Sequence, residues 1–459
     1  MKIIILGAGQ VGRSAAYALS REETNEVTVV DHNDALLRDL QDRIDVRTVC
    51  GNAASPEVLR AAGCGEAQLL IALTNSDEIN MTACHVAWTL FKTPSKLARI
   101  RNPAYTQHAE LFSDISGFAV DAWISPEQKV TEYIEQLIEY PGALQVLDFA
   151  DGRVRLVGVR AVMGGLLVGQ ALSILPSHLK GRDTRVAAIY RKGRSIQPEG
   201  NTVIEPDDEV FFLSARDDIR TVMSELRKLE APIQKIMIAG AGHIGLRLAQ
   251  SLEGRKEIKL IERSREAAKE AAELLNSALV LEGDAADEEL LIEENIDGID
   301  AFIAVTNNEE TNILAAMQAK RLGCRKVMAL INKPSYVDLM ESDGIDIAIS
   351  PQMITIGSLL AYVRAGDVTK VHSLRRGAAE ALEAVVRGDA ESSQVVGRQL
   401  EQITLPEGTT IAAIVRADVV LMAHHDLVIE EGDHVIMFLT DRRHVSSIEK
   451  LFQAGVSFI

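Results

Sequence analysis

The sequence predicts an α/β protein made of two tandem Rossmann-like parallel-sheet domains, each followed by a small α+β lobe. Three observations lead to this prediction. The glycine-rich segment Gly7-Ala-Gly-Gln-Val-Gly12 returns as Gly240-Ala-Gly-His-Ile-Gly245, and the segments that follow it return at offsets of 231 to 233 residues. A second set of matches, Ala187–Arg191 with Ala412–Arg416, has an offset of 225. Within each repeat, short apolar runs alternate with helical stretches, as in a parallel sheet covered by helices.

The first Rossmann-like domain is expected to contain five buried strands. Strands that are covered on both faces are apolar throughout and show no alternation. The runs with this property are Ile3–Leu6, Val27–Val30, Val46–Val49, Leu69–Leu73 and Ala98–Ile100.

A helix is expected to leave this sheet at Ser125-Pro-Glu-Gln128, which combines an N-cap Ser, a Pro at the first helical position and a Gln close behind. It should stop at Pro141-Gly142, and Ser350-Pro351 opens its counterpart. The lobe that follows has short strands, separated by turns rich in Gly, Pro and Asp, at Val154–Arg160, Val186–Arg191 and Val210–Leu213.

These signals predict six segments along the chain. They are a Rossmann-like domain at 1–124, a linking helix at 125–142, a small lobe at 143–228, a second Rossmann-like domain at 232–349, a second linking helix at 350–366 and a second lobe at 368–453.

Composition excludes several classes of protein. Of the 459 residues, 47% are hydrophobic and 25% are charged, which fits a globular protein with real cores. The 48 Lys and Arg against 66 Asp and Glu give a net charge of −18, so a nucleic acid or an anionic membrane would repel the chain. The sequence from Met1 does not predict a signal peptide, and the four cysteines show no paired spacing. A cytoplasmic location is expected.

The glycine turn of the first repeat is a candidate nucleotide site. In such a turn Gly7 permits the bend, Gly9 lets a pyrophosphate approach the backbone and Gly12 lets helix and strand pack. Asp31 follows nineteen residues after Gly12, at the end of the second strand, where a carboxylate accepts ribose hydroxyls and repels a 2′-phosphate. The alternative interpretation is that the glycines serve packing only.

The second repeat keeps the glycines and ends its second strand in Glu262, seventeen residues after Gly245. Arg263 hints at a 2′-phosphate, but the retained carboxylate argues against one. The alternative here is a degenerate repeat that is kept for assembly.

Polar residues follow the next strands at the edge that faces the ligand crevice. We expect contacts to ribose or phosphate, or capping of the next helix, from the pairs Thr74-Asn75 and Thr306-Asn307. Near the expected adenine position, at the end of the third strand, lie Asn52 and Asp284.

Arg99 ends the fifth strand, where a guanidinium can bind a phosphate through two hydrogen bonds or form an ion pair. The second repeat has Leu330 at this position, which predicts unequal sites. No catalytic motif is visible, and no metal site is expected, because His424-His425-Asp426 and His434 lack the spacing of metal ligands.

The arrangement resembles the RCK (regulator of potassium conductance) proteins, and within them the cytosolic regulatory subunits of bacterial Trk potassium uptake systems. The resemblance runs from Met1 to Glu449. Its most specific segments are Thr74–Asn80, Ala98–Arg101, Glu139–Gln145 and Val435–Leu439.

The resemblance implies a non-catalytic sensor of NAD(H) or of ATP and ADP. It also implies a homo-oligomer, a tetramer that forms a gating ring on the cytosolic face of a TrkH- or TrkG-like potassium-translocating membrane protein. Carried over residue by residue, the implied contacts are Gly7, Ala8, Gly9, Gln10, Val11, Gly12, Asp31, Asn52, Thr74, Asn75 and Arg99 in the first site, and Gly240, Ala241, Gly242, His243, Ile244, Gly245, Glu262, Asp284, Thr306 and Asn307 in the second.

Two other functions remain open at this point. An NAD-dependent oxidoreductase would need a substrate domain with a proton-transfer residue, but a second cofactor domain fills that part of the chain. A duplicated scaffold would bind no nucleotide at all. Hydride turnover would favour the first of these, and failure to bind nucleotide the second.

Overall fold

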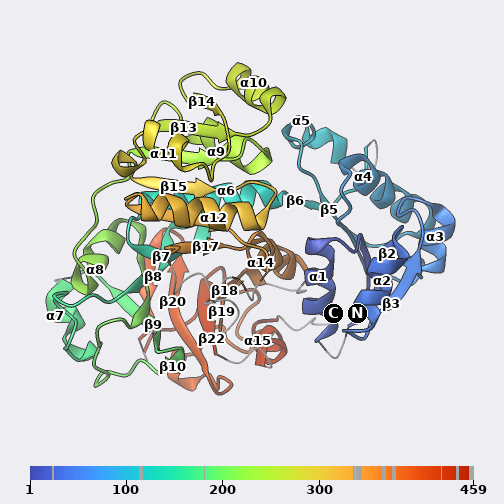
Figure 1. Cartoon of the computed structure of the whole chain (residues 1–459). Coiled ribbons are helices and arrows are strands. Elements are labelled where there is room, and N and C mark those ends of the chain that lie inside the picture. Colours follow the sequence, from blue (N-terminus) through green and yellow to red (C-terminus); the bar gives the residue numbers. More distant parts are fainter. Residues whose placement is uncertain are drawn as a thin grey trace. The chain divides into compact units, whose positions relative to one another are not determined.

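The structure is a computed structural model that describes residues 1–453 apart from 23–24, 113–116, 180, 334–335, 337–343, 364–367, 375–378, 425 and 441–443. It confirms the predicted fold class, since each of two six-stranded parallel sheets is followed along the chain by a five-stranded antiparallel sheet (Figure 1). The end of the second predicted linking helix, residues 364–366, and His425 lie outside the described residues.

The first parallel sheet has the strand order β3-β2-β1-β4-β5-β6, so the chain changes direction between β1 and β4. In open α/β sheets ligands bind at this point, at the carboxyl ends of the strands. The strands are β1 Lys2–Leu6, β2 Glu26–Asp31, β3 Arg47–Cys50, β4 Leu69–Ala72, β5 Ser95–Arg99 and β6 Ala122–Ile124. The helices are α1 Gln10–Ser20, α2 Asp34–Gln41, α3 Pro56–Ala61, α4 Asp77–Val86 and α5 Pro103–Thr106, with a π-helical segment at Ala87–Phe91.

The linking helix α6 Pro126–Glu139 leads into the first antiparallel lobe, whose strand order is β10-β9-β11-β8-β7. The strands are β7 Ala143–Phe149, β8 Val154–Arg160, β9 Thr184–Arg191, β10 Arg194–Ile196 and β11 Glu209–Ala215, and the helices are α7 Leu175–Leu179 and α8 Ile219–Leu226.

The second parallel sheet repeats the first, in the order β14-β13-β12-β15-β16-β17. Its strands are β12 Lys235–Ala239, β13 Glu257–Glu262, β14 Leu279–Glu282, β15 Ala301–Ala304, β16 Lys326–Leu330 and β17 Ile347–Ile349. Its helices are α9 His243–Leu252, α10 Arg265–Leu274, α11 Glu288–Glu293 and α12 Glu309–Arg321.

The second antiparallel lobe has the order β18-β19-β22-β20-β21 and shares one apolar core with the first lobe. Phe149 and Phe211 of the first lobe pack in one cluster with Phe438 of the second. The elements are β18 Val368–Leu374, β19 Ala379–Val385, β20 Thr409–Arg416, β21 Val419–Met422, β22 His434–Leu439 and α15 Val445–Phe452.

The second linking helix, α14 Pro351–Val363, belongs to the first Rossmann-like domain by its packing. The chain divides into two compact units, Met1–Val130 with Ser350–Val363 and Thr131–Ile349 with Arg364–Ile459. Within the first unit α14 packs on α1, and Ser14 Oγ donates to Gln352 Oε1 at 3.2 Å. A helix of the second repeat therefore completes a domain of the first.

Candidate functional site

The first and third glycines of each turn are required by close packing. Gly7 and Gly240 have φ of +103° and +105°, a region that other residues avoid. A Cβ on Gly12 would lie 1.9 Å from the Gly7 carbonyl oxygen, and a Cβ on Gly245 would lie 1.9 Å from the Gly240 carbonyl oxygen. These four glycines fix the bend between strand and helix in both repeats.

The middle glycine is different, because packing does not require it. A Cβ on Gly9 would have no described atom within 4 Å, and one on Gly242 would make only an ordinary contact of 3.9 Å with Asn307 Oδ1. Both residues have ordinary negative φ angles, −69° and −68°. Their missing side chains leave open space directly in front of the backbone, which a pyrophosphate needs.

The helices that begin at these turns also lack side-chain caps. In the described part of the chain no side chain caps α1 or α9. Other helices of the same domains are capped, α2 by Asn33, α10 by Ser264 and α12 by Asn308. The first turns, which contain Gln10 and His243, therefore present backbone N–H groups to an anion.

A carboxylate from the second strand lies beside each turn. Asp31 is buried, and its Oδ2 accepts from the Ala8 backbone N–H at 2.6 Å. Glu262 Oε2 accepts from the Ala241 N–H at 2.7 Å. Glu262 Oε1 accepts from the Ser264 N–H, and Asp31 Oδ1 accepts from the Asn33 N–H and lies 3.3 Å from His32 Nδ1. The carboxylate oxygen that faces each glycine turn keeps a lone pair that can accept from a ribose hydroxyl.

The predicted Thr residues take part in a buried network. Thr74 Oγ1 donates to Asn80 Oδ1 at 2.7 Å, and Thr306 Oγ1 donates to Asn312 Oδ1 at 2.6 Å. The hydroxyl protons are thereby used to hold the edge of the sheet. Asn75 and Asn307 are exposed beside them. Sequence reasoning gave no role to Asn80 and Asn312, although both recur at the same place in the repeated segment.

Asn52 and Asp284 stabilise their own turns at the end of the third strand. Asn52 Oδ1 accepts from the Ala54 N–H and Asp284 Oδ1 from the Ala286 N–H, each at 2.9 Å. This geometry gives both residues a structural role, and a contact to adenine stays a prediction.

Arg99 is engaged in an ion pair. Its Nη2 lies 2.6 Å from Glu127 Oε1, and the two side chains are 18% and 13% exposed. Strand pairing places Leu330 at the position of Arg99 and Gln352 at the position of Glu127, since Arg99 pairs with Ile124 and Leu330 with Ile349. The second repeat has thus replaced both members of the pair, and unequal nucleotide sites stay a prediction.

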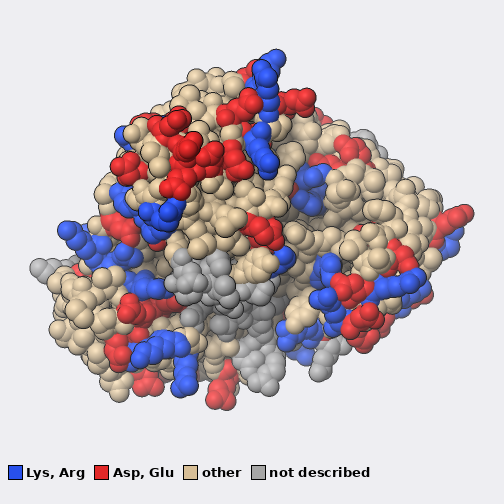
Figure 2. Space-filling view, viewed as in Figure 1, with Lys and Arg blue, Asp and Glu red and all other residues tan. Residues whose placement is uncertain are grey.

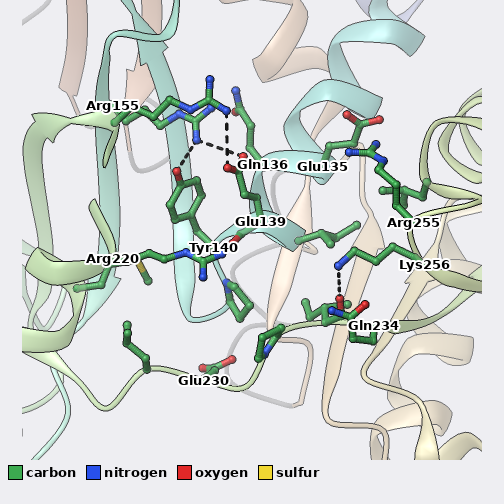
Figure 3. Close-up of a pocket in the computed structure, with 18 of the residues that line it drawn as sticks. Glu135, Gln136, Glu139, Tyr140, Arg155, Arg220, Glu230, Gln234, Arg255 and Lys256 are labelled. Carbon is green, nitrogen blue, oxygen red and sulfur yellow. Dashed lines mark hydrogen bonds and ion pairs between the residues drawn. The ribbon is translucent and has the colours of Figure 1, made fainter. Parts of the chain in front are cut away.

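A cavity of about 700 Å³ with a mixed polar and apolar lining lies in the second unit, away from the predicted sites (Figure 3). The end of α9 lines it, about 15 Å along the helix from the glycine turn, and none of its lining residues is a predicted ligand contact. In its wall the buried Arg155 donates to Asp148 and to Tyr140 OH, each at 2.6 Å. Burial raises the pKa of Tyr140. Arg155 and Tyr140 are therefore satisfied polar groups of the wall.

A metal-binding cluster and a membrane-spanning helix are both absent from the described residues. They contain no group of three or more His, Cys, Asp or Glu side chains arranged to hold a metal ion. None of their helices combines the length and the apolar composition that crossing a membrane requires. Nδ1 of His434 lies 2.7 Å from Oε1 of the buried Glu383.

Solved structures define the class of fold. The RCK domain of GsuK superposes with a TM-score of 0.61 at 18% identity, covering 98% of this chain and 94% of that one. The GsuK channel bound to NAD superposes with a TM-score of 0.62 at 20% identity, covering 98% and 78%. The protein has the fold of tandem RCK domains.

The family is shown by sequence. The TrkA-N domain matches residues 3–126 and 236–351, and the TrkA-C domain matches 156–227 and 389–453. The Trk system potassium uptake proteins TrkA of Halomonas elongata and Vibrio alginolyticus are each 55% identical, with 100% of both chains covered. That of Haemophilus influenzae is 45% identical over the same extent. The chain belongs to the TrkA family of potassium uptake proteins, as the resemblance predicted.

Proposed function

We propose that this protein is a non-catalytic regulatory subunit of a potassium uptake system and that it binds nucleotides at its two glycine turns. NAD(H) and ATP or ADP are the proposed ligands. The protein acts as a tetrameric ring on the cytoplasmic side of a TrkH- or TrkG-like membrane subunit, which holds it at the membrane.

The open space at Gly9 and Gly242 carries this proposal. A turn that served packing alone would need its first and third glycines but would gain nothing from the middle one. The uncapped helix beside each middle glycine adds backbone donors for phosphate, and the carboxylates of Asp31 and Glu262 add acceptors for ribose. These groups suit an adenosine ribose with free hydroxyls and disfavour a 2′-phosphate.

Regulation requires that a ligand binds one conformation more tightly than another. Helix α6 begins at the carboxyl edge of the first sheet, where Glu127 pairs with Arg99, and leads to the first lobe. A phosphate that draws Arg99 away from Glu127 breaks the ion pair that holds the start of α6 to the sheet. By linkage, the state of the membrane subunit then changes nucleotide affinity.

Calorimetric titration of the purified chain with NADH, NADPH, ATP and ADP tests the proposal. We expect two sites per chain that reject NADPH. Gly9→Ala adds a methyl group to the empty space, so it should abolish binding at the first site and leave the fold intact. Asp31→Ala should weaken the same site, while Gly242→Ala and Glu262→Ala act on the second.

Gly298→Ala is the matched control, because its Cβ also meets no described atom within 4 Å and it lies outside both sites. It should bind as the wild type does. One site per chain would limit the sensor to a single repeat, no binding would leave a scaffold, and turnover of NADH would favour an oxidoreductase.

A further inference from the structure

The connection that follows β8 carries an exposed group of apolar side chains. Residues 162–168, Val-Met-Gly-Gly-Leu-Leu-Val, form what we call the apolar loop. Met163 is 80% exposed, Leu166 62% and Val162 43%. Val203 is 42% exposed and lies beside them, since bridges join Ala171 to Val203 and Val168 to its neighbour Ile204.

The apolar loop is held firmly in this exposed position. The backbone N–H of Val162 donates to the Leu226 carbonyl at 3.1 Å, and that of Leu167 donates to the Glu225 carbonyl at 2.9 Å. A Cβ on Gly165 would lie 2.4 Å from the Leu226 oxygen, so only glycine permits this approach to the end of α8. The side chains are presented to solvent by an ordered backbone, which lowers the entropy that a partner must remove.

The second repeat provides an internal comparison at the same place in the fold. Ala161 and Val386 make the same backbone bonds to Asp208 and Asp433, and Gly169 and Gly397 end the two connections alike. Between these points the second repeat has ten residues, 387–396, against seven in the apolar loop. Its exposed residues include the charged Arg387, Asp389 and Glu391, and Ala390 is the one apolar side chain among them. The fold therefore does not require an apolar surface here.

The chemistry of the surroundings identifies the kind of partner. From Ala161 to Leu179 the chain contains no Lys, Arg, Asp or Glu, and the surface around α7, at the left in Figure 2, shows few charged side chains. A lipid surface is disfavoured, because binding to anionic headgroups needs Lys or Arg and the chain carries a net charge of −18. Two copies of so acidic a chain repel each other least where neither bears charge.

We propose that the apolar loop is the centre of a two-fold contact with the apolar loop of a second copy of this chain. Each chain has one such loop, because the equivalent loop of the second repeat is polar. One self-complementary surface per chain closes a pair of chains and does not propagate into a filament. A stable contact buries about 800 Å² on each partner, so polar neighbours of the loop form its rim. The contact deepens the oligomeric part of the proposed function and is independent of nucleotide.

Charge substitutions at Met163 test whether loop meets loop. Met163→Glu and Met163→Lys each place like charges opposite one another at the two-fold axis, so each should raise the dissociation constant at least about tenfold. Sedimentation equilibrium should show half the wild-type average mass for each variant alone. An equimolar mixture of the two should restore the wild-type mass, because opposite charges then meet.

Val419→Glu is the control, since Val419 is 58% exposed but lies in the second lobe. This variant should have the wild-type mass. The mass of the wild-type protein should also be the same with and without nucleotide. Replacing residues 162–168 by the native 387–396 sequence should also halve the mass, because it removes the exposed apolar side chains.

Three outcomes would overturn the contact: an unchanged mass in both Met163 variants, opposite effects of Glu and Lys, or a mixture that fails to regain the mass. Because Met163 is exposed, each variant should keep the wild-type circular dichroism and nucleotide stoichiometry. A failure of nucleotide binding in the wild type would count against the proposed function and leave this test intact.

Discussion

Both repeats have an aspartate just before the last strand of the parallel sheet and place a lysine ammonium beside it. The lysine comes from a different element in each repeat. In the first repeat Lys96, on β5 and fully buried, lies 3.0 Å from Asp121, with the Trp88 ring 4.7 Å from its Nζ. In the second repeat the strand position is Val327, and Lys320 on α12 reaches Asp346 at 2.8 Å. Both aspartates also accept the backbone N–H of the strand residue.

The comparison teaches that the repeats differ without leaving a charge unpaired, while the backbone bonds around the charges are retained. The lysine changes its element but keeps its aspartate, whereas the second repeat replaces both members of the Arg99–Glu127 pair, by Leu330 and Gln352. Removing one member of a half-buried pair leaves the other charge poorly compensated, so joint replacement is the less costly route. The repeats thus keep one architecture and differ in the groups that a ligand or a neighbour meets.

The largest effect is expected where the repeats are identical. Gly12→Ala and Gly245→Ala should each cost about 3 kcal/mol, because the new methyl carbon would overlap a carbonyl oxygen of the turn. Gly9→Ala should change stability by less than about 0.5 kcal/mol. Hydrogen exchange followed by mass spectrometry would show which parallel sheet opens. Equal protection in Gly12→Ala and the wild type would contradict the packing role.

The next effect concerns pH, where the lobes differ. Burial against Phe149 and, to a smaller extent, the charge of Lys370 together lower the pKa of His372 to about 4, although the Asp148 carbonyl and Glu383 oppose this shift. The unfolded chain, with an ordinary pKa near 6.5, binds the proton first as pH falls, so stability decreases from about pH 6.5 to about pH 4. Between pH 7 and pH 5 we expect the free energy of unfolding to fall by about 1–2 kcal/mol. This is less than the whole pKa shift corresponds to, because the His372 side chain keeps some contact with water.

His372→Leu installs the residue of the first repeat, Leu147, and should flatten this dependence in urea titrations at the two pH values. An equal pH dependence in the variant would assign the effect to other groups.

The exchanged lysines give the third comparison. Lys96→Met should cost about 1–2 kcal/mol, because Asp121 loses the ammonium that compensates it and is itself only partly exposed. Lys320→Met should cost less than about 1 kcal/mol, since both partners in that pair are about one-third exposed. Local opening free energies from hydrogen exchange would measure both. Equal costs would show that burial does not separate the pairs.

The smallest effect is a coupling energy. Arg99→Leu and Glu127→Gln should each destabilise the first unit, while the double variant, which carries the pair of the second repeat, should recover about 1 kcal/mol of the summed loss. A double-mutant cycle measures this, and strict additivity would mean that the pair contributes nothing. In calorimetry, Arg99→Leu should bring the first site closer to the second in its affinity for ATP.

Most of the parallel sheets could be predicted from the sequence, because their central strands are apolar runs with no competing pattern. The shifting offset between repeats also has a structural counterpart. It falls from 232 at Asn80 to 231 at Ala98, and the extra residue of the first repeat is taken up by the π-helical segment Ala87–Phe91. The strand Ala143–Phe149 was missed as a strand, since Gln145 and Asp148 interrupt its apolar residues.

The glycines and carboxylates of the candidate sites were visible because they lie within one strand–helix–strand unit. The residues that contact the sites from more distant elements could not be predicted in this way. Glu127 is 28 residues from Arg99, and only the pairing of β5 with β6 brings them together. The packing of α14 on α1 joins residues 338 apart, and nothing in the local pattern of either helix specifies that contact.

The packing of α14 on α1 determines when the first domain can finish folding during translation. Helix α14 is uncharged, buries Leu359, Leu360 and Val363, and completes a domain whose other residues end at Val130. A ribosome adding about 5–20 residues per second needs roughly 10–45 s to travel from one segment to the other. During that time one side of α1 in the first domain is not covered by α14. The first domain can therefore finish folding only after the second repeat has been translated, and a chain that ends before α14 has an incomplete first domain.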